Sequence, residues 1–262
     1  MAIQGYAGAV SVRPGDSMPL FLSGPASTVT LTVQRYAGPE SATLTVPVTP
    51  QPVPVTNAWA GYGWAANASF VIPSTFPSAY YRVLDQGAVV TGFVVRPVVP
   101  GSVSKVLLSV DMLTNQAYNG AGGRSLYDPN RASSVSFNRP GGLPDGRELP
   151  LHDWLHAQGR LVECCAAQDL GATGFLNAYD CLIFAGHAEY WTREMCEQVE
   201  AFVAGGGNVI SLSGNTCYRR VRIEQNGRLL VFAKYAGAEA TKPAADEISR
   251  LSRPSRSCRA IA

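Results

Sequence analysis

Two side chains that can do acid/base or metal chemistry follow directly after an apolar run in the second half of the sequence. His187 and Glu189 come after Asp180–Ala185, a short and mainly apolar run that is typical of a strand buried on both faces. A glutamate at the end of such a strand is costly unless it is paired or bound to a metal. The pattern predicts a small polar catalytic site here. The alternative is that Glu189 caps the helix that follows and His187 is a hydrogen-bonded loop residue.

Two other segments rich in Gly, Asn and Tyr also follow expected strands. Residues 111–127 come after Lys105–Val110, and Gly214–Tyr218 comes after Asn208–Ser213. Strands that alternate with helices indicate a parallel, doubly wound sheet. Ligands of open sheets of this kind bind outside the carboxyl ends of the strands. We therefore expect these two segments to converge with the loop that carries His187.

Tyrosines are frequent in the converging loops, where Tyr118, Tyr127 and Tyr190 occur. A phenolate is a hard anionic oxygen donor suited to ferric iron. Together with one carboxylate, such donors would neutralise the charge of the metal without any histidine ligand. Packing in the core is the alternative for each tyrosine, and residue type alone leaves both interpretations open.

The remaining histidines and the cysteines give weaker signals. His152 and His156 are spaced to share one side of an expected surface helix, which can bind metal, but no third ligand is evident nearby. Cys217 has no base near it in the sequence and does not directly follow its strand, which argues against a nucleophile. The six cysteines show no zinc-type spacing, so we interpret them as small buried hydrophobic residues.

Residues 1–102 are expected to be all-β. Thr28–Gln34 and Ser41–Val46 alternate apolar and polar residues with the period of a strand and are rich in β-branched types. Further strands are expected at residues 69–72, 79–84 and 91–96. Short strands separated by turns predict an N-terminal β-sandwich, which a Pro- and Gly-containing linker at residues 97–102 joins to the rest of the chain.

Residues 103–236 are expected to form a doubly wound, mostly parallel α/β domain, and residues 237–262 an irregular or disordered tail. A further strand is expected at Arg160–Cys165. One helix is expected at Leu149–His156, with Leu151, Trp154 and Leu155 on its apolar side. The clearest helix is Thr192–Ala204, which Thr192 can cap and which has an apolar stripe at Met195, Val199, Phe202 and Val203.

The composition excludes several classes of protein. Hydrophobic residues make up 46% of the 262 residues and charged residues 15%, which is typical of a globular chain. The formal net charge of +2 gives no basic face for nucleic acid. Neither a signal peptide nor an apolar run long enough to span a membrane is evident, so we expect a cytoplasmic protein without membrane contact.

Four motifs, in order along the chain, resemble the large subunit of N,N-dimethylformamidase: Gln116–Tyr127, Val135–Pro140, Gly186–Trp191 and Ala204–Thr216. The resemblance covers residues 60–235, and the second half also resembles, more loosely, the class I glutamine-amidotransferase-like fold. The implied fold class is α/β plus all-β. It comprises a β-sandwich followed by an amidotransferase-like domain that is truncated at the C-terminus, since the family continues well beyond Phe232–Ala236.

The resemblance implies that the protein hydrolyses the C–N bond of a small N-substituted amide at a mononuclear, ferric iron. Two tyrosines and one glutamate hold the metal in that family. Glu189 matches the glutamate of the motif Gly-His-x-Glu-Tyr-Trp, and Tyr118 is the choice for one tyrosine. Tyr81, near where the family has Ser-Gly-x-Tyr, is the choice for the other, and Tyr127 is its competitor.

The same resemblance assigns catalytic roles beside the metal. His187 matches the histidine of the motif and would shuttle protons to the leaving amine, and Asn215 matches the asparagine of Ser-Gly-Asn-Thr and would donate to the oxyanion. The iron would polarise the amide carbonyl or lower the pKa of a bound water. Two residues depart from the family: Asn138 stands where Asp is usual, and Tyr218 where Trp is common.

Two other functions stay open. One is a catalytically inactive or incomplete binding or assembly module that keeps the fold. The other is a different hydrolase on the amidotransferase-like fold, which would not depend on Glu189. The resemblance also implies association, with a small partner subunit or as a homo-oligomer.

Overall fold

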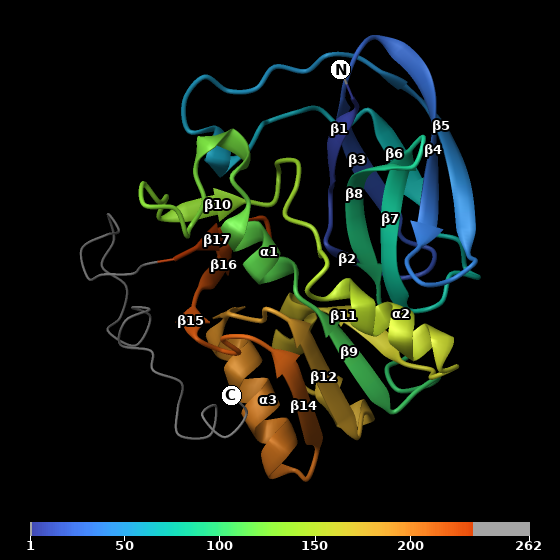
Figure 1. The fold of residues 1–262 in the computed structure, drawn as a ribbon, viewed down its shortest axis with the longest axis vertical. Helices are drawn as coiled ribbons and strands as arrows, with labels where there is room; N and C mark the ends of the chain where they lie inside the picture. The colour runs from blue at the N-terminus through green and yellow to red at the C-terminus, as the bar shows by residue number, and fades with distance from the viewer. Residues whose placement is uncertain (1, 233–262) are drawn as a thin grey trace.

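The computed structural model describes residues 2–232, which form two regions stacked on each other (Figure 1). The first, called here the two-sheet region, contains only strands and one short 3-10 turn at Ala58–Ala60. Its strands are β1 (Gln4–Ala7), β2 (Ser11–Val12), β3 (Ser17–Ser23), β4 (Ser27–Arg35), β5 (Ser41–Val48), β6 (Ala68–Val71), β7 (Ala79–Asp85) and β8 (Ala88–Val95). One sheet has the order β1-β3-β6 and the other β2-β8-β7-β4-β5.

The two sheets enclose one apolar core, because alternate residues of their strands face inward. Leu31 and Val33 of β4 are fully buried, whereas the hydroxyl of Thr30 pairs with that of Thr45 across the outer face at 3.0 Å. Met18 of β3 belongs to the same core. The strands predicted at residues 28–34, 41–46, 69–72, 79–84 and 91–96 are confirmed with small shifts at their ends.

The second region, called here the parallel-sheet region, is built on a sheet of order β11-β9-β12-β14 in which all neighbours are parallel. Its strands are β9 (Val106–Val110), β11 (Glu163–Ala166), β12 (Cys181–Gly186) and β14 (Asn208–Ser213). Its helices are α1 (Met112–Tyr118), α2 (Leu149–Ala157) and α3 (Arg193–Ala204). Short 3-10 turns cover Ala121–Gly123, Ala167–Gly171 and Phe175–Ala178.

Helix α3 forms as its sequence predicts. The hydroxyl of Thr192 accepts the backbone N–H of Met195 and so caps the first turn. Met195, Val199 and Phe202 are buried on one side of the helix, whereas Val203, also predicted on this apolar side, is 40% exposed. Gly206 follows with φ 94°, a left-handed conformation that glycine adopts without strain.

Helix α2 also forms, but its predicted apolar side is wrong in one residue. Trp154 is 57% exposed, whereas His152 and Leu155 are buried. These two side chains lie three positions apart and thus share one face of the helix. This face is turned to the two-sheet region, since the ring of His152 meets the ring of Tyr36 edge-on at 6.1 Å between centroids.

Smaller sheets complete the parallel-sheet region. Strands β10 (Ser134–Ser136), β16 (Arg222–Glu224) and β17 (Leu229–Val231) form an antiparallel sheet, and β13 (Tyr190–Trp191) pairs in parallel with β15 (Arg219–Arg220). A parallel α/β sheet combined with antiparallel sheets agrees with the predicted fold class in general terms. The predicted tail lies outside the described residues. No helix within residues 2–232 is long and apolar enough to cross a membrane.

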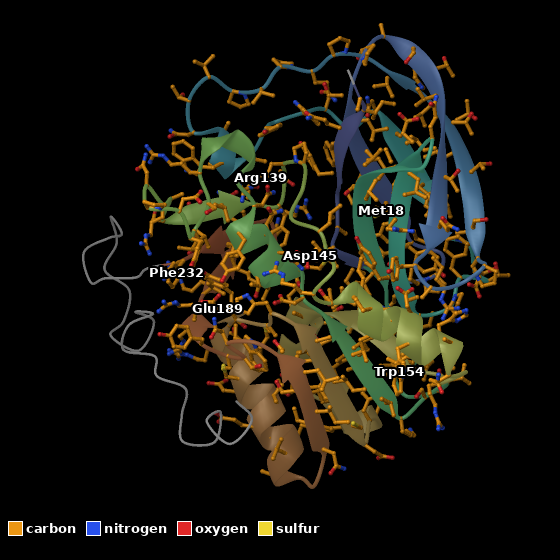
Figure 2. The ribbon with its side chains drawn as sticks, in the orientation of Figure 1. Met18, Arg139, Asp145, Trp154, Glu189 and Phe232 are labelled. Carbon is orange, nitrogen blue, oxygen red and sulfur yellow. The ribbon has the colours of Figure 1, made fainter. Side chains whose placement is uncertain are left out.

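The two regions are held together by polar contacts as well as by apolar packing. The hydroxyl of Ser78 accepts the backbone N–H of Cys164 at 2.7 Å and donates to its carbonyl at 2.9 Å. The hydroxyl of Tyr36 donates to Asp153 at 2.7 Å. Tyr80 of β7 packs into the core of the parallel-sheet region. Figure 2 shows the result: Met18 lies inside the two-sheet region, and Glu189 lies near the ends of the parallel strands.

Candidate functional site

The predicted convergence of three loops is confirmed. Strands β9, β12 and β14 are neighbours in the parallel sheet, and each runs directly into one of the three segments. The segment after β9 is not only a loop, however, because α1 begins there. Asp111 caps this short helix: its Oδ1 accepts the backbone N–H groups of Leu113 at 2.9 Å and Thr114 at 3.0 Å. Helix α1 carries Tyr118 in its last turn.

A glycine allows the chain to turn from β12 into the site. Gly186 has φ 73°, and a Cβ placed on it would lie 2.9 Å from the Cβ of Glu148. Both the backbone conformation and the space therefore exclude a larger residue. His187 and Glu189 follow at once, so this turn sets where their side chains point.

One hydroxyl group joins α1 to the loop that carries Glu189. Thr114 Oγ1 accepts the backbone N–H of Glu189 at 2.9 Å and that of Tyr190 at 3.3 Å. Thr114 lies one helical turn before Tyr118, so both side chains are on the same face of α1. The contact of Thr114 thus sets the relative position of Tyr118 and Glu189.

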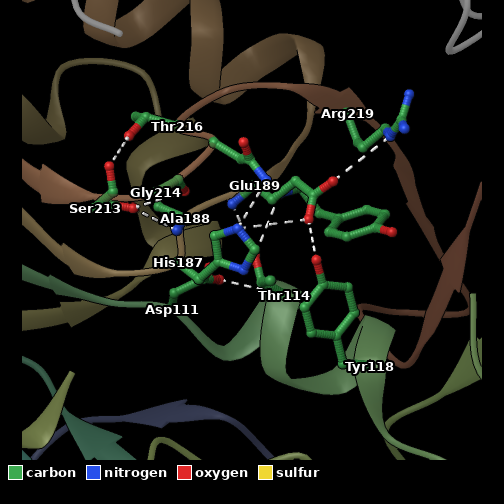
Figure 3. Close-up of polar contacts among 12 residues, drawn as sticks. Asp111, Thr114, Tyr118, His187, Ala188, Glu189, Ser213, Gly214, Thr216 and Arg219 are labelled. Carbon is green, nitrogen blue, oxygen red and sulfur yellow. Dashed lines mark hydrogen bonds and ion pairs between the residues drawn. The ribbon is translucent and has the colours of Figure 1, made fainter. Parts of the chain in front are cut away.

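The carboxylate of Glu189 is buried and paired on both oxygens (Figure 3). Tyr118 donates its hydroxyl hydrogen to Oε2, and Arg219 Nε lies 3.6 Å from Oε1. His187 Nε2 lies 3.9 Å from Oε2. The cap of α3 is Thr192, so Glu189 does not have the capping role considered as its alternative.

His187 and Asn215 are in contact. Asn215 Nδ2 lies 3.0 Å from His187 Nε2, and His187 Nδ1 is buried with no hydrogen-bond partner within the described part of the chain. The Asn215 amide can donate to Nε2 when the ring proton of His187 is on Nδ1. Asn215 has φ 52°, a left-handed conformation that Asn tolerates in tight turns.

Two further phenol rings lie against Tyr118: that of Tyr190, which is buried, and that of Tyr127, which is 64% exposed. The ring centroid of Tyr118 lies 4.8 Å from that of Tyr127 and 6.1 Å from that of Tyr190. Burial, and then the hydrogen bond to Glu189, raise the pKa of Tyr118 above its ordinary value. Tyr118 is therefore a neutral donor at pH 7 unless a cation replaces its proton.

Tyr81, predicted as the second tyrosine ligand, is not brought to this cluster. It lies on β7 in the core of the two-sheet region, where its ring stacks on Phe76 with centroids 4.5 Å apart. Its hydroxyl donates to the carbonyl of Pro77 at 3.1 Å. The side chains of β7 alternate between faces, which directs Tyr80 to the parallel-sheet region and Tyr81 away from it. Of the two candidates, Tyr127 is the one that contacts Tyr118.

The other sequence candidates lie outside the cluster. His152 is buried against the two-sheet region, contrary to the predicted surface position, while His156 is exposed. Cys217 is buried, with its sulfur 3.4 Å from that of Cys196. Among residues 2–232, no group of three His, Cys, Asp or Glu side chains is placed to hold a metal ion.

Two residues of the site were missed by the sequence analysis, Thr114 and Arg219. Arg219 reaches Glu189 because β15 pairs with β13, a pairing that no local pattern reveals. Thr114 is one polar residue in an expected loop, and only its helical neighbour Tyr118 could have drawn attention to it.

The motif Val135–Pro140 contributes to the site indirectly, through the buried side chain of Arg139. Arg139 is fully buried and donates to the backbone carbonyl of Gln116 in α1 at 3.0 Å, and to those of Ala121 at 2.6 Å and Arg124 at 3.0 Å in the loop that follows α1. Burial lowers the pKa of its guanidinium to about 10, so the group stays charged at pH 7. Arg139 therefore shapes the loop that carries Tyr127.

Two further carboxyl groups are buried beneath the site. Glu148 Oε1 accepts the backbone N–H of Asp111 at 2.9 Å. Burial, and then the charge of Asp111, raise the pKa of Glu148 to about 8, and burial raises that of Asp111 to about 6. Glu148 is thus mainly a neutral acid at pH 7. It lies against Gly186 and next to Asp111 without adding a second negative charge to that of Asp111.

The chain thus combines a two-sheet region with a parallel-sheet region that carries a cluster of oxygen donors at its strand ends. The N,N-dimethylformamidase beta subunit-like, C-terminal family matches residues 29–255, and the chain belongs to this family. The match confirms the resemblance found in the motifs. No curated protein matches the chain significantly.

Proposed function

We propose that this protein hydrolyses the C–N bond of a small N-substituted amide, similar to N,N-dimethylformamide, at the cluster of Tyr118, His187, Glu189 and Asn215. The observation that supports this most is the contact of a phenol and a buried carboxylate, joined by Thr114, with a histidine and an amide at hydrogen-bond distance from each other. Membership of the family supports the same reaction class. The finer fold assignments, a β-sandwich and an amidotransferase-like domain, belong to this proposal as well.

The donor atoms of the cluster fit a hard cation such as ferric iron. Tyr118 and Glu189 place two oxygen donors in contact in a buried site, and Tyr127 is the neighbouring phenol that would complete the set. Tyr81 does not fit, since its hydroxyl is engaged in the other core. When bound, the metal would supply Lewis-acid polarisation of the amide carbonyl and acidify a water molecule.

The residues around the donor pair account for the proton movements. In hydrolysis, water adds its oxygen to the amide carbon, the C–N bond breaks, and the nitrogen leaves as an amine after it gains a proton. His187 Nε2, which lies 3.0 Å from Asn215 Nδ2, would take the proton from water and return it to the leaving nitrogen. Asn215 would donate its second N–H to the developing oxyanion. The ion pair of Arg219 with Oε1 holds the carboxylate of Glu189 in its orientation.

The test is iron content together with product release from the full chain. We expect stoichiometric iron, and formate and dimethylamine from N,N-dimethylformamide. Glu189→Gln should lose the iron and lower turnover by at least ~100-fold, because even groups that only orient metal ligands contribute ~10–100-fold. Glu197→Gln, which changes an exposed carboxylate on α3, is the matched control and should retain both. Absence of iron and of hydrolysis after reconstitution with iron would contradict the proposal.

A partner subunit is part of the same proposal. The description of the family as beta subunit-like supports association with a second, different chain. If the chain instead serves as a binding or assembly module without activity, Glu189→Gln would leave partner binding unchanged and the purified protein would contain no iron. Iron content therefore distinguishes the two functions even where full turnover requires the partner.

A further inference from the structure

Two cysteine side chains from different elements meet beside the segment that carries Asn215. Cys196 lies in α3, and Cys217 lies between β14 and β15, 21 residues further on. Their sulfur atoms are 3.4 Å apart, and both groups are thiols in the structure. The two sulfur atoms of a disulfide are ~2.0 Å apart, so a movement of little more than ~1 Å would allow the bond to form.

Two other cysteines, Cys164 and Cys165, differ from this pair. They are consecutive residues of β11, so their side chains point to opposite faces of the sheet. Burial raises the pKa of Cys164 to about 12 and that of Cys165 well above its ordinary value. The reactive form of a cysteine is the thiolate. These two residues therefore stay unreactive thiols at pH 7.

The two thiols of the pair differ in their access to solvent. Cys217 is only 7% exposed, whereas Cys196 is partly exposed. A dissolved oxidant can thus reach Cys196 first, and Cys217 then lies close enough to react with the oxidised sulfur. An accessible cysteine next to a second, resolving cysteine is the arrangement typical of reversible oxidation sites.

The backbone links Cys217 directly to the candidate site. Its N–H donates to the carbonyl of Ala188 at 3.0 Å, and Ala188 stands between His187 and Glu189. Both Asn215 and Cys217 have left-handed backbone conformations, with φ of 52° and 55°. Residues other than glycine rarely adopt such conformations, and the surrounding contacts must hold them there. A new bond that pulls on Cys217 would therefore disturb the turn that places Asn215 against His187.

We propose that Cys196 and Cys217 are a site of reversible oxidation, at which a peroxide converts the two thiols into an intramolecular disulfide that ties α3 to the segment Gly214–Tyr218. The consequence for hydrolysis, a displaced Asn215 and slower turnover, rests on the proposed function. The formation of the disulfide itself does not depend on that function.

The reaction balances with hydrogen peroxide as the oxidant. The thiolate sulfur of Cys196 attacks one peroxide oxygen, the O–O bond breaks, and the released hydroxide takes up a proton to form water. Cys196 is then a sulfenic acid. The sulfur of Cys217, after losing its proton, attacks the sulfur of Cys196, the S–O bond breaks, and a second water molecule leaves. The two thiols thus lose two electrons and two protons, and the peroxide is reduced to two water molecules.

Peptide mapping of the full chain by mass spectrometry tests the disulfide. The reduced protein is treated with hydrogen peroxide, its remaining thiols are blocked with N-ethylmaleimide, and it is digested. We expect one pair of peptides joined through Cys196 and Cys217, which dithiothreitol separates. Cys258, which lies outside the described residues, is the competing partner for either sulfur. A bond to Cys258, or the absence of the joined peptides, would overturn the proposal.

Two serine variants and one control establish the order of the steps. Cys217→Ser removes the second thiol with little change in size, so Cys196 should stop at the sulfenic acid, which dimedone traps. Cys196→Ser should leave Cys217 reduced, because that sulfur is buried. Cys181→Ser changes a partly exposed cysteine of β12 and should form the disulfide as the wild-type protein does. Rapid oxidation of Cys217 in the absence of Cys196 would overturn the proposed order of attack.

Turnover of N,N-dimethylformamide separates this proposal from the proposed function. The oxidised protein should hydrolyse the amide at least ~10-fold more slowly than the reduced protein, since a displacement of ~1 Å can cost ~100-fold in rate. Dithiothreitol should restore the rate, and Cys217→Ser should show no such difference. If neither form hydrolyses the amide, the proposed function fails while the peptide map still decides on the disulfide. Equal turnover of the two forms would overturn the link between the disulfide and Asn215.

Discussion

Tyr81 and Tyr118 are the same residue type in the two regions, and their environments are opposite. The hydroxyl of Tyr81 is satisfied by the carbonyl of Pro77, close to it in sequence, and its ring stacks on Phe76 in an apolar core. The hydroxyl of Tyr118 donates to a carboxylate that another strand end supplies. A phenol whose partner is local and neutral stabilises its own turn. A phenol that meets a buried carboxylate can exchange its proton for a cation.

Replacing each tyrosine by phenylalanine tests this contrast and has the largest expected effect. Tyr118→Phe should lower iron content and amide hydrolysis by at least ~100-fold, because it removes an oxygen donor from the cluster. Tyr81→Phe should retain both and reduce the free energy of unfolding by only about 1 kcal/mol, the typical contribution of one hydrogen bond. Metal analysis and urea unfolding measure the two effects. Equal loss of iron in both variants would refute the contrast.

Thr114→Val sharpens the contrast, since it alters the support of Tyr118 without altering a donor oxygen. The change leaves the backbone N–H groups of Glu189 and Tyr190 without an acceptor, at a cost of ~1–3 kcal/mol in the free energy of unfolding. Iron affinity should fall by roughly tenfold. Thr114→Ser retains the hydroxyl and should restore most of the affinity. If Val and Ser behave alike, Thr114 has no positioning role.

Glu148→Gln has the smallest expected effect. It should change the pH dependence of the free energy of unfolding and not the rate of hydrolysis. The folded protein keeps the Glu148 proton up to about pH 8, whereas the unfolded chain loses it near pH ~4.5, so the free energy of unfolding falls as pH rises between these values. Gln keeps the acceptor for Asp111 and removes the titration. The decrease between pH ~6.5 and ~8.5 should become smaller by about 1 kcal/mol or more.

Urea unfolding across this pH interval measures the effect of Glu148→Gln. His152 does not affect the comparison, because its lowered pKa of about 4 in the folded state contributes equally to the wild-type protein and to the variant. Glu197→Gln is again the exposed control. An unchanged pH dependence in Glu148→Gln would show that Glu148 is ionised in the folded protein.

The elements that local pattern determines were predicted well. The alternation in β4 and β5 and the apolar stripe of α3 appear in the structure as the sequence indicates, because each pattern reports burial of one face. Helix α1 was missed, since it is short and leads into a loop rich in glycine. The exposure of Trp154 was not predicted, because the face of α2 that the two-sheet region covers carries His152 and not Trp154. The periodicity of the helix does not reveal which face a distant part of the chain will cover.

The candidate site was predictable where its residues directly follow strands. His187, Glu189 and Asn215 do so, and the structure brings them together with Tyr118. Arg219 and the position of Tyr81 were not predictable. The contact of Arg219 with the site depends on the pairing of β13 with β15. The position of Tyr81 depends on which face of β7 meets the parallel-sheet region. Both depend on tertiary contacts that leave no pattern in the local sequence.

The placement of the catalytic cluster entirely within the parallel-sheet region has a mechanical consequence. Thr114 ties α1 to the loop after β12, and every member of the cluster lies between Thr114 and Arg219. A hinge motion between the two regions would leave the distances among these side chains unchanged. The same motion would widen or narrow a cavity around His152, which both regions line. The proposed chemistry is thus independent of a movement that would change the space around His152.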